Sequence, residues 1–166
     1  MDDFWELEIA DIKSLFSATH FVVGSRYCEP IHGHDYNIRI MAEGSLNKGQ
    51  MVIDFLDLKP IMRKITNELK GKILLPTKNS LMETEIVGNK CIVKIYSNNK
   101  EYAFPEKKVA LLPIKNTTVE ELARYIGEKI FNEIEKIGVE NITKLKVWIG
   151  ETKKQGSWYV KLIDKK

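Results

Sequence analysis

The sequence predicts an α+β protein in which an antiparallel β-sheet is covered on one face by two helices. Apolar and polar residues alternate with a period of two near both ends of the chain, which is typical of half-buried antiparallel strands. Two longer segments carry apolar residues at the spacing of an amphipathic helix. This order favours one layer of sheet and one of helices, and 166 residues fit a single domain over 1–166.

Composition excludes several classes of protein. Hydrophobic residues make up 43% of the chain and charged residues 30%, which is typical of a globular domain and not of a disordered chain. The net charge is +3 and the lysines are spread along the chain, so we expect no nucleic-acid partner. No apolar run approaches the roughly 20 residues of a membrane helix, and the acidic N-terminal segment lacks the features of a secretory signal. We therefore expect a cytoplasmic protein with no membrane partner.

The first half of the chain predicts strands followed by one helix. Residues Trp5–Ile9 and 36–40 alternate between apolar and polar side chains, which predicts two strands. Asp54 is a suitable N-cap, and apolar residues recur at helical spacing over 55–69. Gly71 favours the end of this helix, because glycine adopts the left-handed backbone of a helix terminus without strain.

Residues of about 73–113 predict a β-rich insertion. Two apolar runs flank the dipeptide Gly88-Asn89, which is typical of a tight hairpin turn. A second turn is predicted at Asn98-Asn99, before another short run. We therefore expect an extra β-hairpin segment that departs from the main sheet.

The second helix has the clearest boundaries in the sequence. Thr118 followed by Glu121 has the spacing of a capping box at the helix start. Gly138 favours the helix end, and residues 142–150 and 158–163 predict two final strands. The apolar stripe between the two ends consists of Leu122, Ile126, Ile130, Ile134 and Ile137.

All three histidines of the chain fall within a short segment. His32 and His34 are two residues apart, so on a strand both rings lie on one face, close enough to share an ion. His20 could approach from a neighbouring strand. Three imidazoles with one open position form a catalytic zinc arrangement. The alternative is three histidines with ordinary hydrogen bonds, but their proximity favours a zinc site.

Two candidate bases precede this pair of histidines. Cys28 offers a thiol and Glu29 a carboxylate, three to four residues before His32. A nearby dication would lower the pKa of the thiol and make a thiolate base available. The alternative for Cys28 is a buried, inert thiol, which is also our expectation for Cys91 inside an apolar run. Two cysteines are too few for a disulfide framework.

The chain resembles the 6-pyruvoyltetrahydropterin synthase / 6-carboxytetrahydropterin synthase family. The resemblance covers most of the sequence apart from about 73–113. The matching motifs are Phe16-Ser17-Ala18-Thr19-His20, Cys28-x-x-x-His32-Gly33-His34-Asp35-Tyr36, Gly49-Gln50-Met51-Val52-Ile53-Asp54-Phe55, Thr117-Thr118-Val119-Glu120-Glu121-Leu122-Ala123 and Glu151-Thr152.

The resemblance implies a tunnelling fold (T-fold), in which subunits join their sheets into a barrel. It implies a homo-hexamer built as a dimer of trimers, with active sites between subunits. It also implies zinc on His20, His32 and His34, and a small-molecule pterin as the substrate.

The resemblance further implies that Glu151 anchors the pterin. A pterin presents an amidine-like edge of N–H donors, and a carboxylate can accept two hydrogen bonds from it. Thr117 and Thr118 are expected to contact the substrate in the same way. Their alternative role is to cap the second helix.

The sequence departs from the family pattern at the catalytic base. The family carries an Asp-His pair after the first helix, and the matching stretch 69–76 has neither residue. Some relatives use a glutamate in place of the cysteine to cleave the side chain of dihydroneopterin, and here Glu29 directly follows Cys28. Neighbours on an extended strand point to opposite faces, so only one of the two is expected to serve as the base. The missing Asp-His pair favours Glu29.

We therefore expect a zinc-dependent lyase that acts on the side chain of 7,8-dihydroneopterin triphosphate, of the 6-carboxy- or 6-pyruvoyl-tetrahydropterin synthase type. Its product would serve queuosine-type or folate-type biosynthesis. One alternative is aldolase-like cleavage of dihydroneopterin to 6-hydroxymethyl-dihydropterin with Glu29 as base. Others are a non-catalytic pterin-binding protein and, last, a zinc hydrolase unrelated to pterins. Arg26 or a lysine of a neighbouring subunit could bind the triphosphate.

Overall fold

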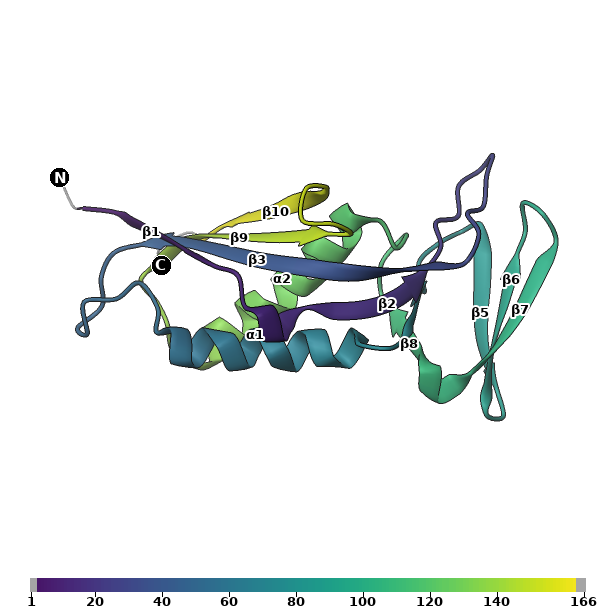
Figure 1. Ribbon diagram of the computed structural model, residues 1–166, viewed down its shortest axis with the longest axis horizontal. Helices are drawn as coiled ribbons and strands as arrows, with labels where there is room; N and C mark the ends of the chain where they lie inside the picture. Colours follow the sequence, from purple (N-terminus) through teal and green to yellow (C-terminus); the bar gives the residue numbers. More distant parts are fainter. Residues whose placement is uncertain (1–2, 164–166) are drawn as a thin grey trace.

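The computed structural model describes residues 3–163 as a sheet-and-helix layer with a small second sheet at one end (Figure 1). The main sheet has seven strands, ordered β10-β9-β3-β2-β4-β8, with β1 also paired to β3. These strands are β1 (Trp5–Ile9), β2 (Phe16–His20), β3 (His32–Gly44), β4 (Ile73–Pro76), β8 (Val109–Leu112), β9 (Ile142–Gly150) and β10 (Gly156–Leu162). The second sheet, ordered β5-β6-β7, consists of β5 (Met82–Val87), β6 (Lys90–Ile95) and β7 (Lys100–Pro105).

Two α-helices, α1 (Phe55–Leu69) and α2 (Val119–Lys136), complete the layer, and the short 3-10 helices η1 (Ile12–Ser14) and η2 (Glu106–Lys108) lie in connections. Neither α-helix among the described residues combines the length and apolar character needed to cross a membrane.

Strand β3 organises the main sheet. Its first part, 32–36, pairs antiparallel with β2, and its later part pairs with β1 on the same side and with β9 on the other. Tyr36, Ile38 and Ile40 alternate on one face of β3 and are fully buried. Both helices pack against that face in one hydrophobic core, so the prediction of two helices on one side of the sheet is confirmed.

The helix ends follow the predicted local chemistry. The Asp54 side chain accepts the backbone N–H of Leu56 at 2.8 Å, and α1 spans the predicted 55–69 before Gly71 turns with a φ of 68°. The Thr118 hydroxyl accepts the N–H of Glu121, but the Glu121 carboxylate accepts the N–H of Lys115. The predicted capping box is therefore closed on one side only.

The predicted insertion is shorter and more complex than the sequence suggested. Strands β4 and β8 belong to the main sheet, where they pair parallel with each other and β4 pairs parallel with β2. Only the segment from β5 to β7 leaves that sheet, and it forms three antiparallel strands instead of a hairpin. The predicted turns are confirmed, with φ of 62° at Gly88 and 53° at Asn99. Four-residue apolar runs such as β4 carry no period that would reveal their partner strand.

The second sheet packs on the connection between β2 and β3, residues 21–31, through a separate hydrophobic cluster. Phe21 and Val23 of that connection contact β6, whose Cys91, Val93 and Ile95 are buried there. The expectation that Cys91 is a core residue is confirmed.

An ion pair connects the segment between β1 and β2 to α1. The Arg63 guanidinium donates to both carboxylate oxygens of Asp11, at 2.8 and 3.1 Å, and the Ser14 hydroxyl donates to the same group at 2.8 Å. The Arg63 hydrogen bond, aided by that of Ser14, lowers the pKa of Asp11 from its ordinary value of 3.8 to about 2, although burial opposes the shift.

This pKa shift predicts part of the acid stability. A carboxyl with a lowered pKa in the folded state contributes stability above its ordinary pKa and loses it as the pH falls toward about 2. We expect Asp11→Asn to lower the stability at neutral pH and to flatten the dependence of stability on pH between about 4 and about 2. Urea unfolding at several pH values measures both effects. The exposed Glu85, changed to Gln, is the control, and equal curves for Asp11→Asn and wild type would contradict the prediction.

Candidate metal centre

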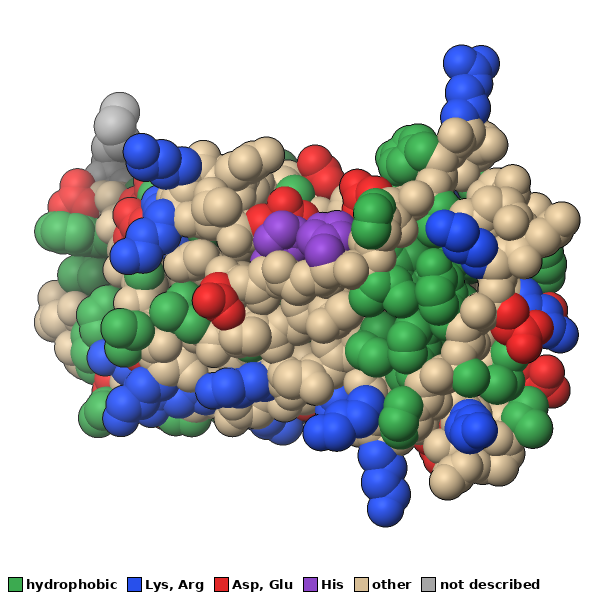
Figure 2. All heavy atoms as spheres, turned by 45° about the vertical axis from the view of Figure 1, so that its right-hand side comes forward, with side chains coloured by type: hydrophobic (Ala, Val, Ile, Leu, Met, Phe, Trp, Pro, Cys, Tyr) green, Lys and Arg blue, Asp and Glu red, His purple; other side chains and the backbone are tan. Residues whose placement is uncertain are grey.

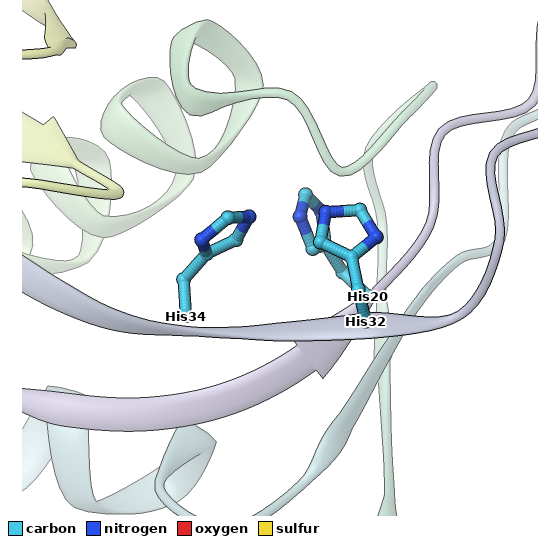
Figure 3. Close-up of side chains that lie close together, drawn as sticks. All are labelled: His20, His32 and His34. Carbon is cyan, nitrogen blue, oxygen red and sulfur yellow. The ribbon is translucent and has the colours of Figure 1, made fainter.

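The pairing of β2 with β3 brings the three histidines together. His20 at the end of β2 lies directly opposite His32 at the start of β3, and His34 follows on the same face. One ring nitrogen of each histidine lies within 4.8 Å of the others. Figure 3 shows the three rings on one side of the two strands, around a shared space.

The hydrogen bonds of the rings suit a metal ion. Nδ1 of His20 lies 2.9 Å from the carbonyl oxygen of Thr117, and Nδ1 of His32 lies 2.8 Å from that of Pro30. Since a carbonyl oxygen only accepts, each Nδ1 carries the proton and each Nε2 presents a lone pair. Nε2 of His20 and of His34 are buried without a hydrogen-bond partner among the described residues. Unpartnered buried nitrogens of this kind fit zinc or a similar transition metal.

The electrostatics keep His20 available as a ligand. Burial lowers the pKa of His20, and the neighbouring His32 and His34 lower it further, while the Thr117 carbonyl and Glu151 oppose the shift. A lowered pKa keeps the ring neutral at physiological pH, and a neutral ring is the form that binds a metal.

Glu151 lies beside the histidines, directly after β9. Its Oε1 is 3.7 Å from Nε2 of His20 and 3.7 Å from Nε2 of His34. Figure 2 shows histidine side-chain atoms at the surface, with acidic side chains next to them. The carboxylate is partly exposed and accepts no hydrogen bond from the described residues, so it can receive donors from a ligand.

Thr117 and Thr118 form different contacts in the structure. Thr117 is fully buried, its hydroxyl donates to the Phe21 carbonyl at 3.0 Å, and its own carbonyl orients His20. Thr118 uses its hydroxyl to cap α2. The sequence did not reveal that Thr117 acts on His20 through its backbone.

The side chains of the two candidate bases lie in different surroundings. Val23 forms an isolated bridge with Cys28, and the Cys28 side chain packs against the second hydrophobic cluster. The Glu29 carboxylate lies elsewhere, where its Oε2 accepts the N–H of Val22 at 3.0 Å. Together with Glu151, it raises the pKa of Tyr36, although burial is the largest cause of that shift. The Cys28 thiol and the Glu29 carboxylate therefore have different partners.

Tyr36 is a polar residue of this face that the sequence did not single out. It follows His34 by two residues, and its ring lies 5.7 Å from that of His34 and 5.9 Å from that of His20. Its hydroxyl is buried without a hydrogen-bond partner in the described part of the chain. The signal was its period-two spacing from His32 and His34, which we interpreted as strand packing alone.

Fold and site together define an α+β protein whose strands bring together three histidines that could hold a metal ion, beside a carboxylate. Residues 10–161 match the family model described as 6-pyruvoyl tetrahydropterin synthase. The chain therefore belongs to the 6-pyruvoyl tetrahydropterin synthase family, and the predicted resemblance is confirmed.

Relatives and solved structures agree with this assignment. A "Putative 6-carboxy-5,6,7,8-tetrahydropterin synthase" of Methanocaldococcus jannaschii is 35% identical over 152 residues, which cover 91% of this chain and 92% of the relative. A dihydroneopterin monophosphate aldolase of Pyrococcus furiosus is 31% identical over 77 residues, 46% of this chain and 62% of that protein.

The crystal structure of 6-pyruvoyl tetrahydropterin synthase from Plasmodium vivax superimposes with a TM-score of 0.92 at 26% identity, over 98% of this chain and 100% of that chain. This likeness confirms the predicted tunnelling fold. Two further structures of the P. vivax protein carry alanine or cysteine in place of a glutamate identified as a catalytic residue.

Proposed function

We propose that this chain is a zinc-dependent lyase that acts on the side chain of 7,8-dihydroneopterin triphosphate, as a 6-carboxy- or 6-pyruvoyl-tetrahydropterin synthase. The observation that carries the proposal is the convergence of three histidine nitrogens within 4.8 Å, with the Glu151 carboxylate 3.7 Å from two of them. Family membership supplies the pterin, and the histidine nitrogens suit zinc.

The residues divide into metal ligands, a ring anchor and a base. His20, His32 and His34 would hold the zinc, which when bound acts as a Lewis acid toward the hydroxyl groups of the substrate side chain. Glu151 accepts N–H donors from the pterin ring and so places the side chain of the substrate beside the histidines. Thr117 keeps the ring of His20 in the tautomer that binds metal.

Glu29 is the base in this proposal. It removes a proton from the substrate side chain, after which carbon–carbon cleavage or loss of the triphosphate follows. Two observations support it over Cys28: the packing of Cys28 into an apolar cluster and the absence of the Asp-His pair. The catalytic glutamate of the P. vivax protein is consistent with this choice.

A second candidate function is aldolase-like cleavage of a dihydroneopterin to 6-hydroxymethyl-dihydropterin, with the same base. The likeness to the P. furiosus dihydroneopterin monophosphate aldolase favours it, although that likeness covers only 46% of the chain. The two functions differ in their products, and a pterin-binding protein without activity would release none.

We further propose a homo-hexamer, a dimer of trimers with sites completed between subunits. Strand β10 is at an edge of the main sheet, and its Trp158, Val160 and Leu162 expose 40, 49 and 71% of their surface on alternate positions. An apolar row on an unpaired edge favours assembly with another subunit. Arg26, exposed in the 21–31 connection, or a lysine of the neighbouring subunit would then bind the triphosphate.

The assembly predicts a solution mass of about six subunits, because closing the barrel covers the edge strands. Light scattering coupled to size-exclusion chromatography measures the mass. Changing Val160 to Glu places a charge in the apolar row and is expected to yield smaller species. A monomeric wild type would contradict the proposed assembly.

Removal of zinc is expected to abolish turnover. Dialysis against a chelator should remove the ion, and zinc added back should restore activity. Loss of a residue that supports a metal ligand typically lowers metal affinity by roughly 10–100-fold. His34→Ala removes a ligand itself, so we expect its zinc affinity to fall by more than that. Metal content by mass spectrometry and activity measure these effects. Undiminished activity in the metal-free protein would refute the zinc-dependent mechanism.

The base is tested by two matched substitutions. Glu29→Gln keeps an acceptor for the Val22 N–H and is expected to lower kcat about 10²–10⁴-fold, the usual contribution of a general base. Cys28→Ala should leave kcat nearly unchanged. Each variant is incubated with dihydroneopterin and with its triphosphate, and the products are separated by chromatography. Loss of activity in Cys28→Ala alone would assign the base to Cys28, and a hydroxymethyl product would favour the aldolase function.

A further inference from the structure

The Tyr36 side chain is held rigidly beneath the metal-binding group. Its ring stacks on Phe16 with centroids 5.0 Å apart, and it lies edge-on to both His20 and His34. The residue is fully buried, so its hydroxyl has no access to bulk solvent. The direction of the hydroxyl is therefore determined by the packing of β2 and β3.

The Tyr36 hydroxyl has no acceptor among the described residues. Most buried polar side-chain atoms in folded proteins have a hydrogen-bond partner, and one that does not costs free energy. A phenylalanine would fill the same space in the core without this cost. The presence of a hydroxyl at this position therefore indicates that it gains a hydrogen-bond partner when the site is loaded.

The Glu151 carboxylate, in turn, lacks a hydrogen-bond donor in the described part of the chain. It accepts no hydrogen bond from the described residues, although its Oε1 lies 3.7 Å from Nε2 of His20 and of His34, the two rings that Tyr36 contacts. Glu29, the other carboxylate near Tyr36, already accepts the N–H of Val22. An unpartnered donor and an unpartnered acceptor thus adjoin the same two rings.

We infer that Tyr36 is a positioning residue whose hydroxyl donates to the Glu151 carboxylate when the site is loaded, and so orients that carboxylate for the N–H edge of the pterin. The inference rests on the proposed pterin-binding function of Glu151. Histidine nitrogens that bind an ion cannot donate to the carboxylate, whereas the Tyr36 hydroxyl has a proton to donate and no partner among the described residues. A tyrosine hydroxyl ordinarily carries its proton at physiological pH and can therefore donate it.

The test is Tyr36→Phe in the zinc-loaded protein, with neopterin as the probe. We expect the affinity for neopterin to fall about tenfold, as is typical for loss of a hydrogen bond to a charged group. The zinc content should not change. The melting temperature of the metal-free variant should equal or exceed that of wild type, because an unpartnered buried hydroxyl is removed.

Tyr159→Phe is the matched control. The Tyr159 hydroxyl donates to the Glu128 carboxylate on α2, so this variant also loses a tyrosine–glutamate hydrogen bond. We expect it to lower the melting temperature and to leave the neopterin affinity unchanged. This control distinguishes a general loss of stability from a specific effect on Glu151, the residue proposed to anchor the pterin ring.

A second probe distinguishes ring anchoring from indirect effects. The lumazine analogue of neopterin carries an oxygen in place of the ring amino group and so lacks one donor for Glu151. We expect wild type to bind neopterin more tightly than this analogue. In Tyr36→Phe the ratio of the two affinities should be smaller. Wild-type affinity of Tyr36→Phe for neopterin, or equal losses for both probes, would overturn the role of Tyr36. A wild type that binds neither probe would instead refute the proposed pterin function.

Discussion

The antiparallel register of β2 against β3 is the constraint on which the candidate site depends. It places His20 opposite His32 and sets His34 on the same face, so three imidazoles from two strands share one space. A shift by one residue would turn the rings of one strand to the opposite face of the sheet. The hydrophobic pattern prevents that shift, because Tyr36, Ile38 and Ile40 continue the histidine face of β3 into the core beneath the helices. The candidate metal ligands and the core residues thus occupy alternate positions of the same strand.

Elements from distant parts of the sequence complete the site around these strands. The Thr117 carbonyl before α2 fixes the ring of His20, and Glu151 after β9 brings a carboxylate to the rings. The second sheet supports the connection 21–31 through Phe21, Val23 and Cys28. The strands β5 to β7 thereby support the segment that carries Glu29. The candidate site thus combines buried His20 with the partly exposed carboxylate of Glu151.

Much of the fold could be predicted because it depends on local chemistry. The caps at Asp54 and Thr118 and the turns at Gly88 and Asn99 are short-range features, and the structure confirms each of them. The parallel strands β4 and β8 could not be predicted, since their pairing depends on a crossover that no short-range pattern records. The two turns of the second sheet and the runs around them were predicted from the sequence, but only the structure shows that all three strands pair in one sheet.

By itself, the sequence determined that His32 and His34 share a face, since residues two apart on a strand always do, and that His20 was the remaining imidazole available to join them. Only the tertiary structure decided that the Cys28 side chain enters the apolar cluster and that the Glu29 side chain does not, because this depends on the packing of the second sheet against the connection 21–31. Only the tertiary structure showed that the buried Tyr36 side chain and the Glu151 carboxylate adjoin the same two histidine rings. Contacts between residues so far apart in the chain arise from the packing of whole strands, which the spacing of residues along the chain does not encode.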